Sequence, residues 1–124
     1  MTDRFFAILD LMAEKRLARA GQHAIPLILD IIDSTFYLYG EILEPEELAP
    51  REITAKQVVG WLKRGEYRIG FENFMPFGFV GCEAMADCCR LIGPYLYREY
   101  LGQEYGKFLL DAGIRWARDR NLSV

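Results

Sequence analysis

The chain has 124 residues, of which 52% are hydrophobic and 27% are charged, and its net charge at pH 7 is -3. These values are typical of one globular domain, and they give no reason to expect a nucleic acid or an anionic membrane as partner. No stretch approaches the roughly 18 apolar residues of a membrane span. Arg4 and Asp10 interrupt the N-terminus, which argues against a signal peptide. We therefore expect a cytoplasmic protein.

The cysteines fit neither a disulfide framework nor a metal site. Cys88 and Cys89 are adjacent, Cys82 lies six positions before Cys88, and the only histidine, His23, is far away in the sequence. This spacing does not match the ligand spacing of known zinc sites. We expect three reduced, partly buried thiols and no metal.

Two helices are predicted in the first 40 residues. The first begins at Thr2 or Asp3 and ends near Ala20. Apolar residues recur along it at helical spacing, at Phe6, Leu9, Ala13 and Leu17. A second helix covers 24–40, and the acidic, proline-containing segment 41–51 is expected to be a loop. The breadth of the first apolar stripe predicts packing against this domain or against a second copy.

A helix and three strands are predicted next. Thr54 followed by Gln57 fits a capping box, so a helix should begin there and end at Gly65. The following residues alternate between apolar and polar side chains, which predicts antiparallel strands over 67–72, 77–85 and 88–97. The predicted class is therefore α+β, with a mostly antiparallel sheet of three to four strands, two to three helices before it and a long helix after it.

The segment 95–118 suggests a function. Apolar and aromatic residues suited to a strand are followed by Gly102 and Gly106, and then by an apolar pattern of helical period. A strand, a glycine-bearing turn and a helix in this order direct unpaired backbone N–H groups and the positive end of the helix dipole at one point. An anion such as a phosphate is the natural ligand there.

These residues resemble the acyl-CoA-binding segment of the GNAT N-acetyltransferase family. The family arm, Arg/Gln-Gly-x-Gly-x-Gly/Ala, corresponds to residues 101–106, and a Leu-Leu-x-x-Ala-like helix follows. Leu101 replaces the usual Arg or Gln, and Glu104 stands where a glycine is expected. The segment 76–81, Pro-Phe-Gly-Phe-Val-Gly, also resembles a strand of the family. The resemblance covers residues 53–124, preceded by a helical part over 1–50 of the same single domain.

The resemblance implies transfer of an acetyl group from acetyl-CoA to a small-molecule or protein amine. It implies that strand backbone N–H groups hold the pantetheine and polarise the thioester carbonyl, and that the arm holds the pyrophosphate. The strand residues would be Tyr95, Leu96 and Tyr97. The arm residues would be Leu101, Gly102, Gln103, Glu104, Tyr105, Gly106 and Lys107.

Candidate acid–base residues follow from position. The amine must lose a proton before it attacks, and the strand residue Glu83 is the first candidate base, with Glu72 second. Tyr97 is a candidate acid, and other tyrosines near the arm are candidates by proximity alone. For each of them a solvated or packing role is the alternative. Family members place a tyrosine acid after the next strand, which residues 121–124 only begin.

Glu104 is an electrostatic objection to the arm. A carboxylate about 5 Å from a phosphate costs roughly 3 kcal/mol at an effective dielectric constant near 20. A helix dipole returns only about 0.3–1 kcal/mol. The Glu104 side chain must therefore point into solvent if the arm binds CoA.

Two other functions stay open. The chain could be a non-catalytic, degenerate acyl-CoA-binding or interaction module completed by a partner chain, or an α+β scaffold unrelated to the family. An exposed sheet edge is an association surface. We therefore expect a homodimer or a hetero-complex through the first helix or the C-terminal sheet edge.

Overall fold

The computed structural model describes residues 14–40 and 53–124, and for residues 36–40 only the helical backbone. The start of the predicted first helix and the predicted acidic loop lie outside these ranges. The elements are β1 (Lys15–Arg19), η1 (Gln22–Ala24), α2 (Ile25–Gly40), α4 (Ala55–Arg64), β2 (Glu66–Glu72), β3 (Met75–Ala84), β4 (Cys89–Leu96), η3 (Arg98–Tyr100) and α5 (Tyr105–Asp119).

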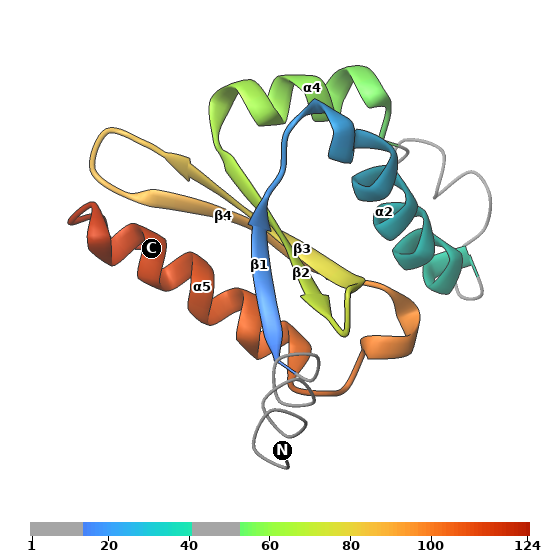
Figure 1. Cartoon of the computed structure of the whole chain (residues 1–124). Coiled ribbons are helices and arrows are strands. Elements are labelled where there is room, and N and C mark those ends of the chain that lie inside the picture. Colours follow the sequence, from blue (N-terminus) through green and yellow to red (C-terminus); the bar gives the residue numbers. More distant parts are fainter. Residues whose placement is uncertain (1–13, 41–52) are drawn as a thin grey trace, which may run out of the picture.

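The four strands form an antiparallel sheet in the order β1-β2-β3-β4. Helices α2 and α4 cover one face, and α5 crosses the other (Figure 1). The α+β class, the antiparallel sheet and the long final helix are confirmed. The central strands β2 and β3 have buried side chains on both faces because both faces are covered there.

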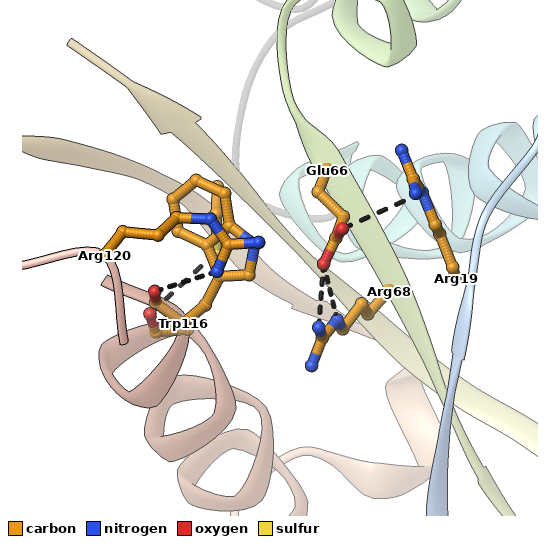
Figure 2. A network of polar contacts seen from close by, with 7 residues as sticks. Arg19, Glu66, Arg68, Trp116 and Arg120 are labelled. Carbon is orange, nitrogen blue, oxygen red and sulfur yellow. Dashed lines mark hydrogen bonds and ion pairs between the residues drawn. The ribbon is translucent and has the colours of Figure 1, made fainter. Parts of the chain in front are cut away.

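The predicted helix ending near Ala20 is wrong in its described part, because residues 15–19 form β1. β1 pairs with β2 from Lys15 opposite Glu72 to Arg19 opposite Arg68. Figure 2 shows the Glu66 carboxylate between these two arginines, at 3.8 Å from Arg19 Nε and 2.8 Å from Arg68 Nη2. The described chain therefore opens with a strand, and the first 50 residues are not purely helical.

The local sequence of β1 is ambiguous, which explains the error. Leu17 belongs to the helical stripe, but it also alternates with the exposed residues Arg16 and Ala18 as a strand requires. Leu17 packs against the α5-side core. A helix would also pair these backbone groups, so the strand is favoured by its docking beside β2 and by the burial of Leu17. Tertiary contacts override helix propensity here.

The predicted start of α4 is confirmed. The Thr54 hydroxyl accepts a hydrogen bond from the Gln57 backbone N–H at 3.3 Å, and the Gln57 side-chain oxygen accepts one from the Thr54 N–H at 2.8 Å. Ile53, just before the cap, packs on the core that contains Val58. The helix ends at Arg64, directly before Gly65.

Two cores flank the sheet. The core under α2 and α4 contains Ile28, Ile31, Ile32, Val58, Tyr67, Ile69 and Phe79. The α5 side contains Phe77, Val80 and Leu109, and farther along the helix Cys82, Cys89, Trp116 and Ala117. Arg120 stacks on the Trp116 ring with its guanidinium carbon 3.9 Å from the ring centre, as Figure 2 shows. This stacking holds the residue after α5 against the last turn of the helix.

β4 lies at the end of the sheet and is bulged. Gly81 lies opposite Ile92, but Phe79 lies opposite Tyr95, so β4 has one extra residue at 93–94. Beyond α5, the Cys89 N–H donates to the Ser123 carbonyl at 2.6 Å, in a single parallel bridge. In the described residues after α5, the pairing with β4 consists of this one bridge, and residues 121–124 do not form a strand.

Candidate functional site

The turn before α5 has the geometry that the sequence predicted. η3 ends at Tyr100, residues 101–104 form the turn, and α5 begins at Tyr105, two residues before the predicted start. Gly102 has a φ of 76°, a left-handed conformation that a side chain disfavours. The first hydrogen bond into α5 is donated by the Phe108 N–H to the Glu104 carbonyl at 3.0 Å.

The amides of this turn are unpaired within the described ranges. The backbone N–H groups of residues 102–107 donate to no described backbone or side-chain acceptor. The Glu104 side chain makes no capping hydrogen bond to α5. No described atom lies within 4 Å of where a Gly102 Cβ would be, and a Gly106 Cβ would meet only Leu96 Cδ1, at 3.4 Å. The turn therefore presents unpaired N–H groups to open space at a helix N-terminus, an arrangement that in proteins suits an anion.

The edge of β4 supplies one of the three strand amides that were predicted to hold pantetheine. The Tyr97 N–H is used within the sheet, because it donates to the Phe77 carbonyl at 2.9 Å. Tyr95 lies opposite Phe79 in the same ladder. Amides alternate along an antiparallel strand, so Leu96, between them, directs its N–H away from β3. Of the three predicted amides, those of Tyr95 and Tyr97 face β3 and that of Leu96 faces outward; that Leu96 binds a ligand stays a prediction.

The Glu104 side chain is 74% exposed, so water screens its charge, but it stays at the first turn of α5, where it lines a cavity with Lys107 and Phe108. It also accepts a hydrogen bond from the Lys15 ammonium of β1, which lowers the pKa of Glu104 and raises that of Lys15. Lys15 Nζ lies 3.6 Å from Glu72, which in turn accepts a hydrogen bond from the Tyr105 hydroxyl at 2.8 Å. No local pattern in the sequence indicates this cluster, because it depends on residues 15–19 forming a strand and not the predicted helix.

The remaining arm residues lie in the turn itself or in the first turn of α5. Leu101 is exposed, and the Gln103 side chain donates to the Glu99 carbonyl at 3.4 Å. The Lys107 ammonium lies on the exposed side of α5, 3.1 Å from Asp111. Lys107 is therefore a cation within reach of solvent at the first turn of the helix.

Tyr97 lies in a cavity that the sequence did not reveal. Its hydroxyl donates to Asp30 of α2 at 2.5 Å; burial and, second, this hydrogen bond raise its pKa. The cavity has a volume of about 440 Å³ and is lined by Asp30, Asp33, Ser34, Tyr97, Arg98 and Glu99. The polar residues Asp30, Asp33 and Ser34 in the otherwise apolar segment 24–40 are the sequence signal that could have indicated α2 as a wall of this cavity.

Glu83 lies away from the turn. Glu83 as a whole is 8% exposed, and its carboxylate lies 3.7 Å from Nε of Arg64 at the end of α4. Gly78 lies against Leu96 and Leu109 of the turn region, whereas Glu83 is five residues farther along β3, about 17 Å at the usual rise of a strand. The alternative of a solvated role is therefore wrong for Glu83, because its side chain is buried beside Arg64. Its assignment as base is untested.

The described residues contain no cluster of histidine, cysteine or acidic side chains suited to a metal ion. Within the same ranges, no helix has the length and hydropathy needed to cross a membrane.

Comparison with known proteins shows the fold. No protein-family model and no curated protein sequence matches the chain. Three solved structures that match are PaiA N-acetyltransferase from Thermoplasma acidophilum in complex with coenzyme A, a predicted acetyltransferase from Clostridium acetobutylicum with acetyl-CoA, and a GCN5-related N-acetyltransferase from Ralstonia eutropha. Their TM-scores are 0.73, 0.62 and 0.66, and their identities to this chain are 15%, 16% and 12%.

The matches cover most of each chain. They span 88%, 88% and 90% of this chain, and 75%, 77% and 82% of the three structures. The chain therefore has the fold of the GNAT N-acetyltransferases, and the resemblance that its segments suggested is confirmed at the level of the fold.

Proposed function

We propose that this protein binds acetyl-CoA and transfers its acetyl group to an amine. The observation that carries the proposal is the run of unpaired N–H groups over 102–107, at the N-terminus of α5 and beside the outward amide of Leu96. Two of the structures with this fold are complexes with coenzyme A or acetyl-CoA. The open space before Gly102 fits a ligand whose phosphates approach the backbone closely.

The turn and the strand edge have different tasks in this proposal. The N–H groups of 102–107 bind the pyrophosphate, helped by the dipole of α5. The Leu96 N–H donates to the thioester carbonyl and stabilises the negative charge that develops on its oxygen during attack. Acetyl-CoA supplies the activated acetyl group.

The cavity between α2 and η3 favours a cationic acceptor. Its lining has three carboxylates, Asp30, Asp33 and Glu99, against the one cation Arg98, and includes Tyr97, the residue directly after β4. Carboxylates attract the ammonium form of an amine, which must then lose a proton to attack. Tyr97 is the candidate for returning a proton to the thiolate product, and its hydroxyl would have to leave the hydrogen bond to Asp30 to do so.

A non-catalytic acyl-CoA-binding or interaction module is the second candidate. It is favoured by the state of the candidate bases: Glu83 is buried in an ion pair, and Glu72 accepts from Tyr105 and lies near Lys15. Association through the outer edge of β4 belongs to this alternative, because a partner strand would use the same amide as the thioester.

Calorimetric titration with CoA and a thiol-release assay with acetyl-CoA against a panel of amines separate the candidates. An acetyltransferase gives binding heat and amine-dependent CoA release; a binding module gives heat without turnover. Absence of both heat and thermal stabilisation at millimolar CoA would reject both and leave the scaffold interpretation.

Replacing Gly106 with valine tests the turn. A side chain there stands beside the N–H groups that receive the phosphates, so we expect CoA affinity to fall at least about 30-fold, which is about 2 kcal/mol. Gly21→Val is the control, since Gly21 has an extended backbone and no atom within 4 Å of its Cβ position. Equal affinity of the two variants would count against the turn.

A further inference from the structure

Lys15 joins β1 to the entrance of the candidate CoA site. Its side chain is only 18% exposed, and its ammonium contacts Glu104, lies 3.6 Å from Glu72 and stands 5.1 Å from the centre of the Tyr105 ring. Together with Glu104, Lys107, Phe108 and Asp111 it lines a cavity of about 250 Å³ at the first turn of α5. This cation is therefore positioned at the place where a phosphate would meet the helix N-terminus.

The charges around Lys15 are unfavourable for that phosphate. One ammonium faces two carboxylates, Glu72 and Glu104, so this group carries a net charge of -1. The two carboxylates are held differently. Glu72 is 23% exposed and accepts a hydrogen bond from Tyr105, whereas Glu104 is 74% exposed and has Lys15 as its only described side-chain partner. Glu104 can rotate into water at little cost, and Glu72 cannot.

We propose that Glu104 competes with a phosphate of the ligand for Lys15. The Glu104 carboxylate binds the Lys15 ammonium in the free protein, and a phosphate group of CoA replaces this carboxylate when CoA binds. This inference rests on the proposed function. It accounts for an anionic side chain at a phosphate-binding turn, because Glu104 takes the place beside the Lys15 ammonium that Glu72, 3.6 Å away, leaves open. It also makes Glu104 a determinant that lowers CoA affinity.

The test is CoA titration of Glu104→Gln, which keeps the size of the side chain and removes its charge. We expect CoA to bind about three- to tenfold more tightly. The substitution removes a solvent-screened repulsion between the Glu104 carboxylate and the phosphate, and it leaves Lys15 available to the phosphate. Lys15→Met should weaken CoA binding. In the double variant, Glu104→Gln should lose most of its benefit, because the competition requires the lysine.

Two controls separate this effect from a general change in charge. Asp87→Asn changes the net charge by the same amount in the exposed β3–β4 turn, and it should leave CoA affinity unchanged. Pantetheine, which lacks the phosphates, should bind wild type and Glu104→Gln equally. Urea unfolding of each variant checks that it is folded. The Glu104→Gln variant should be folded because Lys15 keeps its ion pair with Glu72.

The outcomes distinguish the two proposals. Wild-type binding of CoA with unchanged or weaker binding by Glu104→Gln would overturn the competition and leave the proposed function intact. An equal gain in the presence and absence of Lys15 would also overturn it. Binding by Glu104→Gln alone would support the competition, and binding by neither protein would overturn both proposals.

Discussion

At the scale of single residues, Tyr67 is an unusual core residue. It is fully buried, its ring stacks on Trp61 at 5.9 Å and tilts against Phe79 at 6.2 Å, and its hydroxyl has no described hydrogen-bond partner. A buried hydroxyl without a partner costs free energy, because water is lost and nothing replaces it. The ring stabilises the fold and the hydroxyl opposes it.

We predict that Tyr67→Phe raises the free energy of unfolding by about 0.5–2 kcal/mol, measured by urea denaturation. Tyr105→Phe is the matched control, because its hydroxyl donates to Glu72 at 2.8 Å. That variant should lose about 0.5–1.5 kcal/mol. A loss of stability in Tyr67→Phe would mean that the hydroxyl has a partner in solution.

The pH dependence of Tyr67 has a definite sign. Burial raises its pKa above the ordinary value of 10.0. Above pH 10 the unfolded chain therefore releases this proton before the folded protein does, so stability decreases as pH rises. Tyr67→Phe should show a smaller alkaline loss than wild type, with the remainder due in part to Tyr97, whose pKa is also raised. Unfolding midpoints between pH 9 and 11 measure the difference.

At the scale of elements, α4 was predictable because its start signal is local. Thr54 and Gln57 are three residues apart, and their reciprocal hydrogen bonds need nothing from the rest of the chain. β1 is the opposite case. Its five residues become a strand only because β2 lies beside them.

We predict that Thr54→Ala lowers the free energy of unfolding by about 1 kcal/mol, since it leaves the Gln57 N–H without its acceptor. Thr35→Ala is the control. The Thr35 hydroxyl donates at 3.3 Å to the Ile31 carbonyl within α2, a bond that helices do not require, so its loss should change stability by less than about 0.5 kcal/mol. Equal effects of the two substitutions in urea denaturation would contradict a working cap.

At the scale of the whole molecule, α5 seals one face of the sheet over two of the three thiols. Cys82 and Cys89 are 4% and 3% exposed, and Cys88 is half-buried. Burial raises the pKa of Cys82 to about 12 and also raises that of Cys89. Thiolates are the reactive species, so protection should follow the packing of α5.

We predict that iodoacetamide at pH 8 labels Cys88 at least about 100-fold faster than Cys82 or Cys89, and that all three react in denaturing urea. Mass spectrometry of peptides after timed quenching measures the three rates. Labelling of Cys82 at the rate of Cys88 in the folded protein would show that α5 opens readily from the sheet. A Cys82→Ser variant identifies the mass-spectrometric signal that belongs to labelled Cys82.

The local sequence by itself determined α2, α4, the three strands after Gly65 and the glycine turn before α5. Caps, alternation and glycines act over a few residues, so their signals can be read without the fold. Tertiary structure decided the strand at 15–19, the hydrogen bond from the Tyr97 N–H to Phe77, the burial of Glu83 and the pairing of Lys15 with Glu104. Each depends on contact between residues distant in sequence, and Lys15 and Glu104 are 89 positions apart. No local pattern encodes which of many charges will meet, because that follows from strand order and from the path of α5 across the sheet.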